Sequence, residues 1–292
     1  MVNPLPWGLG NLYNQCMSAA HEAVKHEMLV RYLDAWAPAV LHRNKRATYV
    51  EASDGAGATA LRVFGEFSDL LERNTLTVVL VGPPPEHPVP PGLVVQTVAD
   101  ADALGPALRQ AGALGSPLFV WADHPDSLDD LLSTVSAYPG CEILLAVPRD
   151  ADPDTGQALT VRVDLVDGSR VAERLVFGTG SLKALEKFKD ELWALDEYAG
   201  IRYRDPVDAE GTLLDISLQP NLAPLRRSLI GHLARAGAVS VASLREWTLR
   251  ETIYRAADAT RAVQGLVGSG IAVRTPASGR LSADTLVSRS AA

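Results

Sequence analysis

The sequence predicts an α/β protein: a doubly wound, mostly parallel sheet followed by a small winged helix-turn-helix domain. Short, almost continuously apolar segments such as TVVLV and EILLAV alternate with amphipathic helical patterns, as expected of strands covered on both faces. The 292 residues allow two domains. Of 27 basic and 35 acidic residues, ten arginines and four acids fall within 221–292, which leaves 17 basic and 31 acidic residues before them. This change of charge predicts two modules, 1–218 and 219–292.

The elements of the first module are predicted in order. A helix over 20–37 carries one apolar stripe, formed by Val24, Met28, Leu29, Tyr32, Leu33 and Trp36. A strand over 47–52 leads through a glycine-containing turn into a helix over 58–72. Further strands are expected over 76–81, 93–98, 117–121 and 142–147, and helical patterns near 101–111 and 127–137 separate the later ones. This alternation favours a parallel sheet with helices on both faces.

Residues 157–177 follow a different pattern. Polar and apolar residues alternate with period two around Asp167-Gly168, a pair typical of two-residue hairpin turns. We therefore expect an antiparallel hairpin at the edge of the sheet. A helix over 181–198 and a strand over 212–218 complete the module.

The second module reads as three helices and a hairpin. Helices are expected over 222–236, 241–247 and 252–267, and two short apolar stretches then flank a Pro/Ser/Gly turn in IAVRTPASGRLSA. This order is typical of a winged helix-turn-helix. The third helix is predicted to expose Tyr254, Arg255, Asp258 and Arg261, and the wing carries Arg274 and Arg280. These aromatic and basic residues, Asp258 apart, are the candidate contacts to DNA or RNA, although the arginines are equally compatible with a solvated face.

Several classes of protein are excluded by composition. No apolar run approaches the roughly 20 residues of a membrane span, and the N-terminus lacks the features of a signal peptide. The two cysteines, Cys16 and Cys141, are too few for a disulfide framework, and Cys141 heads an apolar run that predicts burial. We therefore expect a cytoplasmic protein. No Cys/His cluster has the spacing of a zinc site, so no metal is predicted.

The sharpest local signal is the segment from Tyr49 to Gly57, YVEASDGAG. An acid at the end of a strand, followed by glycines that open a helix, lets the backbone approach a nucleotide-like ligand. Enzymes that use S-adenosylmethionine (SAM) and enzymes that use dinucleotides both bind their cofactor at this turn between strand and helix. The candidate cofactor residues are Glu51, Asp54, Gly55 and Gly57.

Longer stretches of the chain resemble the three-Cys-motif partner protein family. Lys25-His26-Glu27-Met28-Leu29, Arg31-Tyr32-Leu33 and Ala35-Trp36 are similar to that family's K-x-x-(I/L)-L-x-x-Y-L-x-x-(W/F) helix, and the Tyr49–Gly57 segment to its Y-(I/V)-D-x-(F)-A-G-x-G loop. PLFVWADHPD, Cys141-Glu142-Ile143-Leu144, and AGIRYRDPVDAEGTLLDISLQPNLAPLRR with the closing helices and wing extend the similarity at low identity.

This resemblance implies a methyltransferase-like Rossmann domain with SAM as its cofactor, and a radical-SAM-type partner protein bearing three cysteines. Asp123 matches the aspartate of the family's D-P-F-G strand end and is the candidate catalytic residue. Asp100 or Asp102 would accept a hydrogen bond from the adenine amine, or else cap the next helix. His26 and His124 are possible acid–base groups.

The sequence departs from a complete SAM site at three places. The second strand ends in Val81-Gly82 and the proline-rich loop 83–91, with no carboxylate to accept hydrogen bonds from ribose hydroxyls. Ser53-Asp54 replaces an apolar pair, and His124 disrupts the Asp-Pro order after Asp123. These departures favour a divergent, catalytically inactive module that binds nucleic acid or a partner. The alternatives are an active SAM-dependent nucleic-acid methyltransferase and a protein-interaction or dimerisation scaffold.

Overall fold

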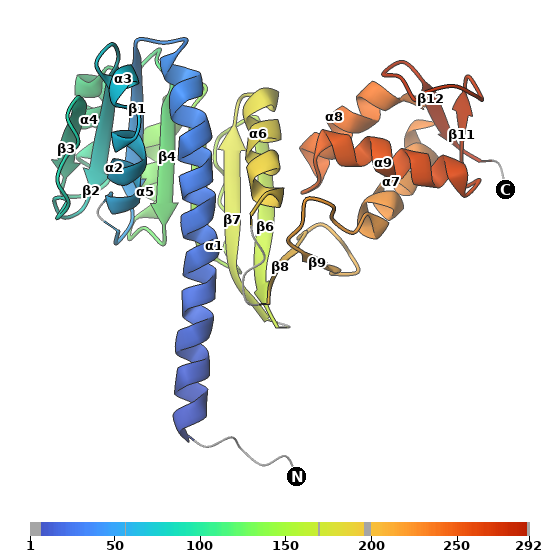
Figure 1. Cartoon of the computed structure of the whole chain (residues 1–292), viewed down its shortest axis with the longest axis horizontal. Helices are drawn as coiled ribbons and strands as arrows, with labels where there is room; N and C mark the ends of the chain where they lie inside the picture. The colour runs from blue at the N-terminus through green and yellow to red at the C-terminus, as the bar shows by residue number, and fades with distance from the viewer. Residues whose placement is uncertain (1–6, 56, 169, 196–199, 291–292) are drawn as a thin grey trace.

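A large mixed sheet organises the fold in the computed structural model, which describes residues 7–55, 57–168, 170–195 and 200–290 (Figure 1). Within these residues nine strands pair in the order β3-β2-β1-β4-β5-β7-β6-β8-β9. The strands are β1 (Arg46–Ala52), β2 (Thr75–Val81), β3 (Leu93–Val98), β4 (Leu118–Asp123), β5 (Glu142–Pro148), β6 (Leu159–Asp167), β7 (Arg170–Thr179), β8 (Ile201–Arg204) and β9 (Leu213–Asp215). β1 to β5 run parallel, and β7 lies antiparallel between β5 and β6. This is a mixed α/β fold: the four pairings among β1 to β5 are parallel, consistent with a methyltransferase-like Rossmann fold, and the four pairings from β5 to β9 are antiparallel.

Helices cover both faces of the sheet, as the continuously apolar strands require. On one face lie α1 (Trp7–Leu41), α2 (Ala58–Gly65), α3 (Ser68–Leu71) and α6 (Leu182–Trp193), and their buried residues form one core with β1, β4 and β7. On the other face α4 (Leu104–Ala111) and α5 (Leu128–Ser136) enclose a second core, which includes Cys141. Cys141 is buried with a free thiol, as predicted, and burial raises its pKa.

Two helices differ from their predicted bounds. α1 begins 13 residues before the predicted start at residue 20, and in Figure 1 its N-terminal part projects beyond the end of the sheet toward which β4 points. The apolar stripe used for the prediction marks only the part that packs on the sheet. The predicted helix over 58–72 is divided into α2 and α3, because the chain turns after Gly65. The predicted helix over 181–198 ends at Trp193, and its last three residues lie outside the described part of the chain.

The hairpin of β6 and β7 forms, but its predicted place at the sheet edge is wrong. β7 pairs with β5 along Ile143–Pro148, so the hairpin's second strand is the one that enters the sheet. β8, which the sequence pattern did not predict, pairs with the outer side of β6, and the short β9 closes the sheet. Since β8 has only four residues, it shows too little alternation to be recognised from sequence.

The C-terminal part contains three helices and a separate three-stranded antiparallel sheet. The elements are α7 (Ala223–Ala236), β10 (Val239–Ser240), α8 (Val241–Glu251), α9 (Ala256–Gly268), β11 (Ala272–Thr275) and β12 (Leu286–Arg289), with strand order β10-β12-β11. The last strand lies beyond the predicted stretch, since residues 276–285 form the connection. The apolar core of this part is continuous with that around α6.

No helix among the described residues has the length and apolar character needed to cross a membrane.

Candidate functional site

The carboxyl ends of β1 and β4 form the centre of the candidate site. After β1 the chain turns through α2 to β2 on one side, whereas after β4 it turns through α5 to β5 on the other. Adjacent parallel strands whose connections leave in opposite directions create a crevice at their carboxyl ends, which is where ligands bind in open α/β sheets. β4 extends to Asp123, two residues beyond its predicted end, and this extension brings Asp123 to the crevice.

Two hollows meet at this crevice. The β-edge hollow, of about 180 Å³, lies between the ends of β1, β2 and β4, and Asp100 and Pro83 are among its lining residues. The Lys25 hollow, of about 340 Å³, lies between the ends of β1 and β4, the start of α2, and α1. The two hollows have four lining residues in common, Ser53, Asp54, Asp123 and His124. We call these four residues the junction.

Glu51 is held within the protein. Its side chain is 3% exposed, and its oxygens accept hydrogen bonds from the Tyr49 hydroxyl at 2.7 Å, the Ser53 hydroxyl at 2.7 Å and the Gly57 amide at 3.1 Å. These three donors fix the turn after β1. Glu51 therefore shapes the site and lines only the Lys25 hollow, whereas the exposed Asp54 lines both hollows.

The glycines of the turn have different roles. Gly57 is in the left-handed region with a φ of 75°, and a Cβ there would lie 2.6 Å from Leu80 Cδ2 on β2. Gly57 is thus required by conformation and by packing. Gly55 is exposed, and a Cβ there would make only ordinary contacts. The intervening Ala56 lies outside the described residues.

Asp123 belongs to a charged cluster centred on Lys25 of α1. The Lys25 side chain is 3% exposed, and its ammonium lies 2.9 Å from Asp123 Oδ2, 2.8 Å from Glu22 Oε1 and 3.3 Å from Glu173 Oε1. Burial opposes the charge of Lys25, but its hydrogen bonds to Glu22 and Asp123 and the charge of Glu173 raise its pKa above the usual value. Burial also raises the pKa of Asp123, against the effect of Lys25.

His124 stands where the cluster meets the crevice. Its φ is 47°, uncommon for a residue other than glycine, and its amide donates to the Ala146 carbonyl at 3.0 Å. Its Nε2 lies 3.1 Å from Glu173 Oε1, while the second oxygen of Glu173 is buried and has no partner among the described residues. The cluster thus connects α1, β4 and β7 at one point.

Asp123 was predicted from sequence as a site residue, whereas Lys25 and Glu173 were not. Asp123 lies 98 positions and Glu173 lies 148 positions from Lys25 in the chain, so no local pattern joins them. One signal was present: Lys25 lies between Val24 and Met28 on the apolar side of its helix, where a lysine requires a buried partner.

Asp100 lies at the β-edge hollow, where its Oδ1 accepts a hydrogen bond from the Ala103 amide at 3.1 Å. This bond holds the turn before α4, which begins at Leu104 rather than near 101; the N-cap of α4 is Ala103, with no side-chain cap. Asp102 lines neither hollow. His26 lines the Lys25 hollow, with its Nδ1 3.1 Å from the Thr59 hydroxyl.

The predicted exposure of Tyr254 and Asp258 is wrong. Tyr254 is 1% exposed, stacks on Trp193 and donates its hydroxyl to the Asn221 carbonyl at 2.8 Å. Asp258 is fully buried because it caps α9 through the Arg255 amide and pairs with the side chains of Arg255 and Arg261.

The other predicted contact residues lie around α9 and the wing. Arg255 also donates to the Leu218 carbonyl at 2.7 Å, and Arg261 retains a 38% exposed side chain. Arg274 donates to four carbonyls of the wing turn, those of Pro276, Ser278, Gly279 and Arg280. Arg280 is exposed. All four arginines lie in the C-terminal part of the chain. Three of them stabilise it from within: Arg255 and Arg261 pair with Asp258 of α9, and Arg274 binds the carbonyls of the wing turn.

No group of three or more His, Cys, Asp and Glu side chains within the described ranges is placed to hold a metal ion.

No family model and no curated protein matches the chain. Among solved structures, the chain is similar to the rRNA methyltransferase AviRa from Streptomyces viridochromogenes, with 14% identity over 52% of this chain and 84% of that one and a TM-score of 0.31. It is also similar to the MycE methyltransferase of the mycinamycin biosynthetic pathway, whose structure contains Mg and S-adenosylhomocysteine (SAH). There the identity is 13%, the coverage 55% of this chain and 48% of that one, about half its length, and the TM-score 0.31.

Proposed function

We propose that this chain is a divergent methyltransferase-like protein that binds a cationic nucleoside ligand of the SAM type at the junction, and that it acts by binding rather than by rapid methyl transfer. The observation that carries this proposal is the acidic lining of two hollows that meet at the topological switch point. Asp54 and Asp123 lie in both hollows, with Asp100 and Asp126 in one and Glu22 in the other.

The charge of the lining fits SAM better than a dinucleotide. A sulfonium is attracted by carboxylates, whereas the pyrophosphate of a dinucleotide would be repelled by Asp54 at the start of α2. Lys25, the lysine of the lining, already contacts three carboxylates. Asp54 and Asp100 are the side chains that would accept hydrogen bonds from the ligand, and when bound SAM would supply an electrophilic methyl group. Together the hollows reach the size range of small-molecule sites, roughly 300–1,000 Å³.

Three features support binding over rapid catalysis. The end of β2 offers Val81 and Gly82 where a ribose acid would be needed. The oxygens of Glu51 are engaged by donors of the protein itself. Asp123, the candidate catalytic residue, is paired with Lys25. An active methyltransferase with a nucleic-acid substrate is the second candidate, favoured by His124 at the junction.

SAM and SAH provide a direct test because SAH lacks only the transferable methyl group and, with it, the positive charge of the sulfonium. We expect SAM to bind the full chain about tenfold more tightly than SAH in calorimetric titrations, as one additional attraction of roughly 1.4 kcal/mol would give. Asp54→Asn should reduce this ratio to about threefold. Asp69→Asn, an exposed acid that lines neither hollow, should leave it unchanged. Equal affinities, or no binding of either at millimolar concentration, would contradict the proposal.

For the C-terminal module, residues 219–292, we propose a winged helix that binds a protein partner. Its three helices and three-stranded sheet support this architecture, but the exposed face of α9 carries the neutral residues Ala257 and Gln264, and its partly exposed Arg261 is paired with Asp258. Apolar side chains are exposed beside it on the wing, at Ile271, Val273 and Leu286. A radical-SAM-type protein is the partner that the family resemblance suggests.

Duplex DNA tests this assignment. At physiological salt we expect no binding of a 20-base-pair duplex tighter than the 10⁻⁴–10⁻⁶ M range of non-specific complexes. Arg255 and Arg274 already bind groups of the protein itself, and the residues before 221 carry a net negative charge that would repel the phosphates. The Arg280→Ala variant should behave like the wild type in fluorescence anisotropy. Tighter binding that falls steeply with salt and is weakened in Arg280→Ala would instead favour nucleic acid.

A further inference from the structure

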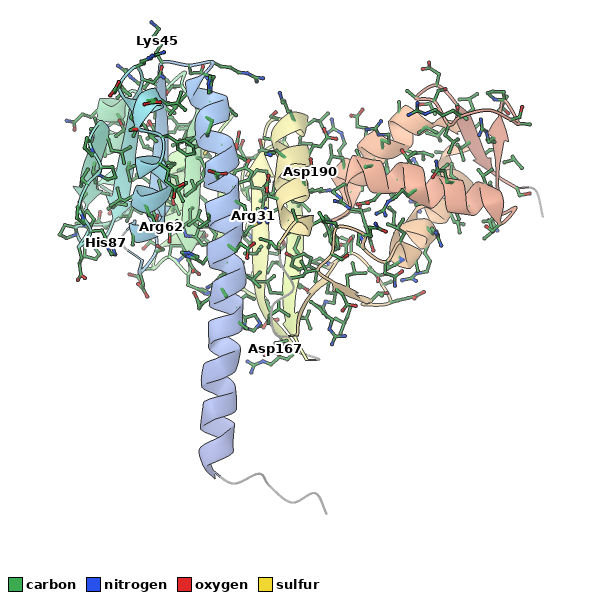
Figure 2. The ribbon with its side chains drawn as sticks, in the orientation of Figure 1. Arg31, Lys45, Arg62, His87, Asp167 and Asp190 are labelled. Atoms are coloured by element: carbon green, nitrogen blue, oxygen red, sulfur yellow. The ribbon has the colours of Figure 1, made fainter. Side chains whose placement is uncertain are left out.

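A third hollow, of about 510 Å³, lies between α1, α2 and the proline-rich loop 83–91. We call it the proline-loop hollow. His26 and Thr59 line both this hollow and the Lys25 hollow, so the two are adjacent. Figure 2 shows the labelled Arg62 and His87 on the same side of the ribbon, near the end of the sheet where the candidate site lies.

The lining of this hollow has the opposite electrostatic character to that of its neighbour. Arg62, His26 and His87 line it together with the hydroxyl-bearing Thr59, and none of its described lining residues carries a carboxylate. The neighbouring Lys25 hollow is lined by Glu22, Glu51, Asp54 and Asp123. A ligand that extends from one hollow to the other would therefore place a positive group beside the carboxylates and a negative group beside Arg62.

The donors of the proline-loop hollow are available for an anion. Arg62 is about half exposed, and the ion pair that it forms with Glu66 at 3.6 Å is between two exposed side chains and contributes little. Its guanidinium can therefore present two parallel N–H groups to an oxyanion. When the Thr59 hydroxyl donates to His26 Nδ1, the ring proton lies on Nε2, which remains a donor.

The loop that carries His87 is held in place by packing. Pro90 packs against Gly65 of α2, where an added Cβ would lie 3.1 Å from Pro90 Cγ. Proline fixes the backbone φ at Pro88 and Pro90, and Pro88 also restricts the backbone of the preceding His87, which limits the entropy that His87 loses on binding. The hollow is thus a preformed site.

We propose that the proline-loop hollow binds the phosphate group of a nucleotide-like ligand, which Arg62, His87 and His26 would hold. Phosphate suits this set because the arginine fork matches two of its oxygens and the imidazoles add further donors. Only the direction of the ligand, with its remaining part toward the junction, rests on the proposed function. The phosphate site itself does not depend on SAM binding.

The test compares adenosine 5′-monophosphate, adenosine and inorganic phosphate as probes in calorimetric titrations of the full chain. We expect the monophosphate to bind at least tenfold more tightly than adenosine. Arg62→Gln should weaken the monophosphate about tenfold and leave adenosine unchanged, and His87→Gln should have a smaller effect of the same kind. Arg73→Gln, an exposed arginine that lines none of the three hollows, is the matched control.

The outcomes separate this proposal from the proposed function. Equal binding of the monophosphate and adenosine, or equal losses in Arg62→Gln and Arg73→Gln, would overturn it. If inorganic phosphate competes with the monophosphate in the wild type and not in Arg62→Gln, the phosphate group is the recognised part. If the wild type does not bind SAM but Arg62→Gln still weakens binding of the monophosphate, only the proposed function is contradicted. Arg62→Gln itself should not change the ratio of the SAM and SAH affinities.

Discussion

Replacing Lys189 by methionine should destabilise the protein by about 3–5 kcal/mol, the largest effect expected of a single substitution here. Lys189 of α6 is fully buried, and its terminal nitrogen lies within hydrogen-bond distance of the carbonyls of Thr248 and Leu249, at the end of α8, and of Thr252 and Tyr254, in the turn that leads to α9. Methionine has a similar length but no donor, so these buried carbonyls would lose their shared partner.

The same substitution should loosen the C-terminal module from α6. The turn is also held by Trp193, whose indole donates to the Ile253 carbonyl at 2.9 Å, and by Asp205, which accepts from the Ile253 amide at 3.3 Å. Amide hydrogen exchange at Ile253 and Tyr254 should therefore accelerate in Lys189→Met. Lys187→Met removes a half-exposed lysine of the same helix and should cost less than about 0.5 kcal/mol. Similar losses in the two variants would contradict the assigned role of Lys189.

The pH dependence of stability provides a second measurement on Lys189. Burial lowers the pKa of Lys189 to about 7, against the charges of Asp205, Glu251 and Asp258, whereas a lysine in the unfolded chain titrates near 10.4. Between these values the unfolded chain binds more protons, so the stability contributed by this group rises with pH from about 7 to 10. In denaturant titrations Lys189→Met should lack this rise.

The succession of strands and helices along the chain was largely predictable from sequence because it depends on local patterns. TVVLV and EILLAV mark β2 and β5 by their apolar continuity, and the alternation in β6 and β7 marks a hairpin. The position of that hairpin was not predictable. β7 pairs with β5 through main-chain hydrogen bonds along Ile143–Pro148, and such pairing leaves no signature in either segment.

The candidate site shows the same limit. Glu51 and Gly57 were visible because a strand, an acid and a glycine turn follow one another in the chain. The interior partners that engage Glu51, and the contact that makes Gly57 necessary, come from Tyr49 and from Leu80 of a different strand. In the C-terminal module, helical periodicity placed Asp258 on an outer face, but its carboxylate turns back to cap α9. Side-chain hydrogen bonds of this kind override the pattern.

Lys25→Met should destabilise the protein by about 3 kcal/mol at neutral pH, because it leaves the partly buried carboxylates of Asp123 and Glu173 without their cation. The lysine stem is kept in length by methionine, so the packing of α1 changes little and the loss reports the charge. Lys45→Met, an exposed lysine at the opposite end of the sheet in Figure 2, is the matched control and should cost less than about 0.5 kcal/mol.

The sign of the pH dependence distinguishes lost charge from lost packing in Lys25→Met. Without Lys25 the pKa of Asp123, already raised by burial, rises further above its value in the unfolded chain. The folded variant then binds more protons than the unfolded chain, so its stability should increase as the pH falls from 7 to 5. A loss caused by packing would be independent of pH over this range.

A double variant connects this cluster to ligand binding. Lys25→Met with Asp123→Asn should recover more than 1 kcal/mol relative to the sum of the single losses, since the uncompensated charge is removed with its partner. Lys25→Met alone removes a positive charge from beside Asp123 of the junction, so the preference for SAM over SAH should increase beyond tenfold. An unchanged ratio in a folded variant would mean that the sulfonium does not lie near Asp123. In that case the β-edge hollow would have to recognise its ligand through Asp54 and Asp100 instead.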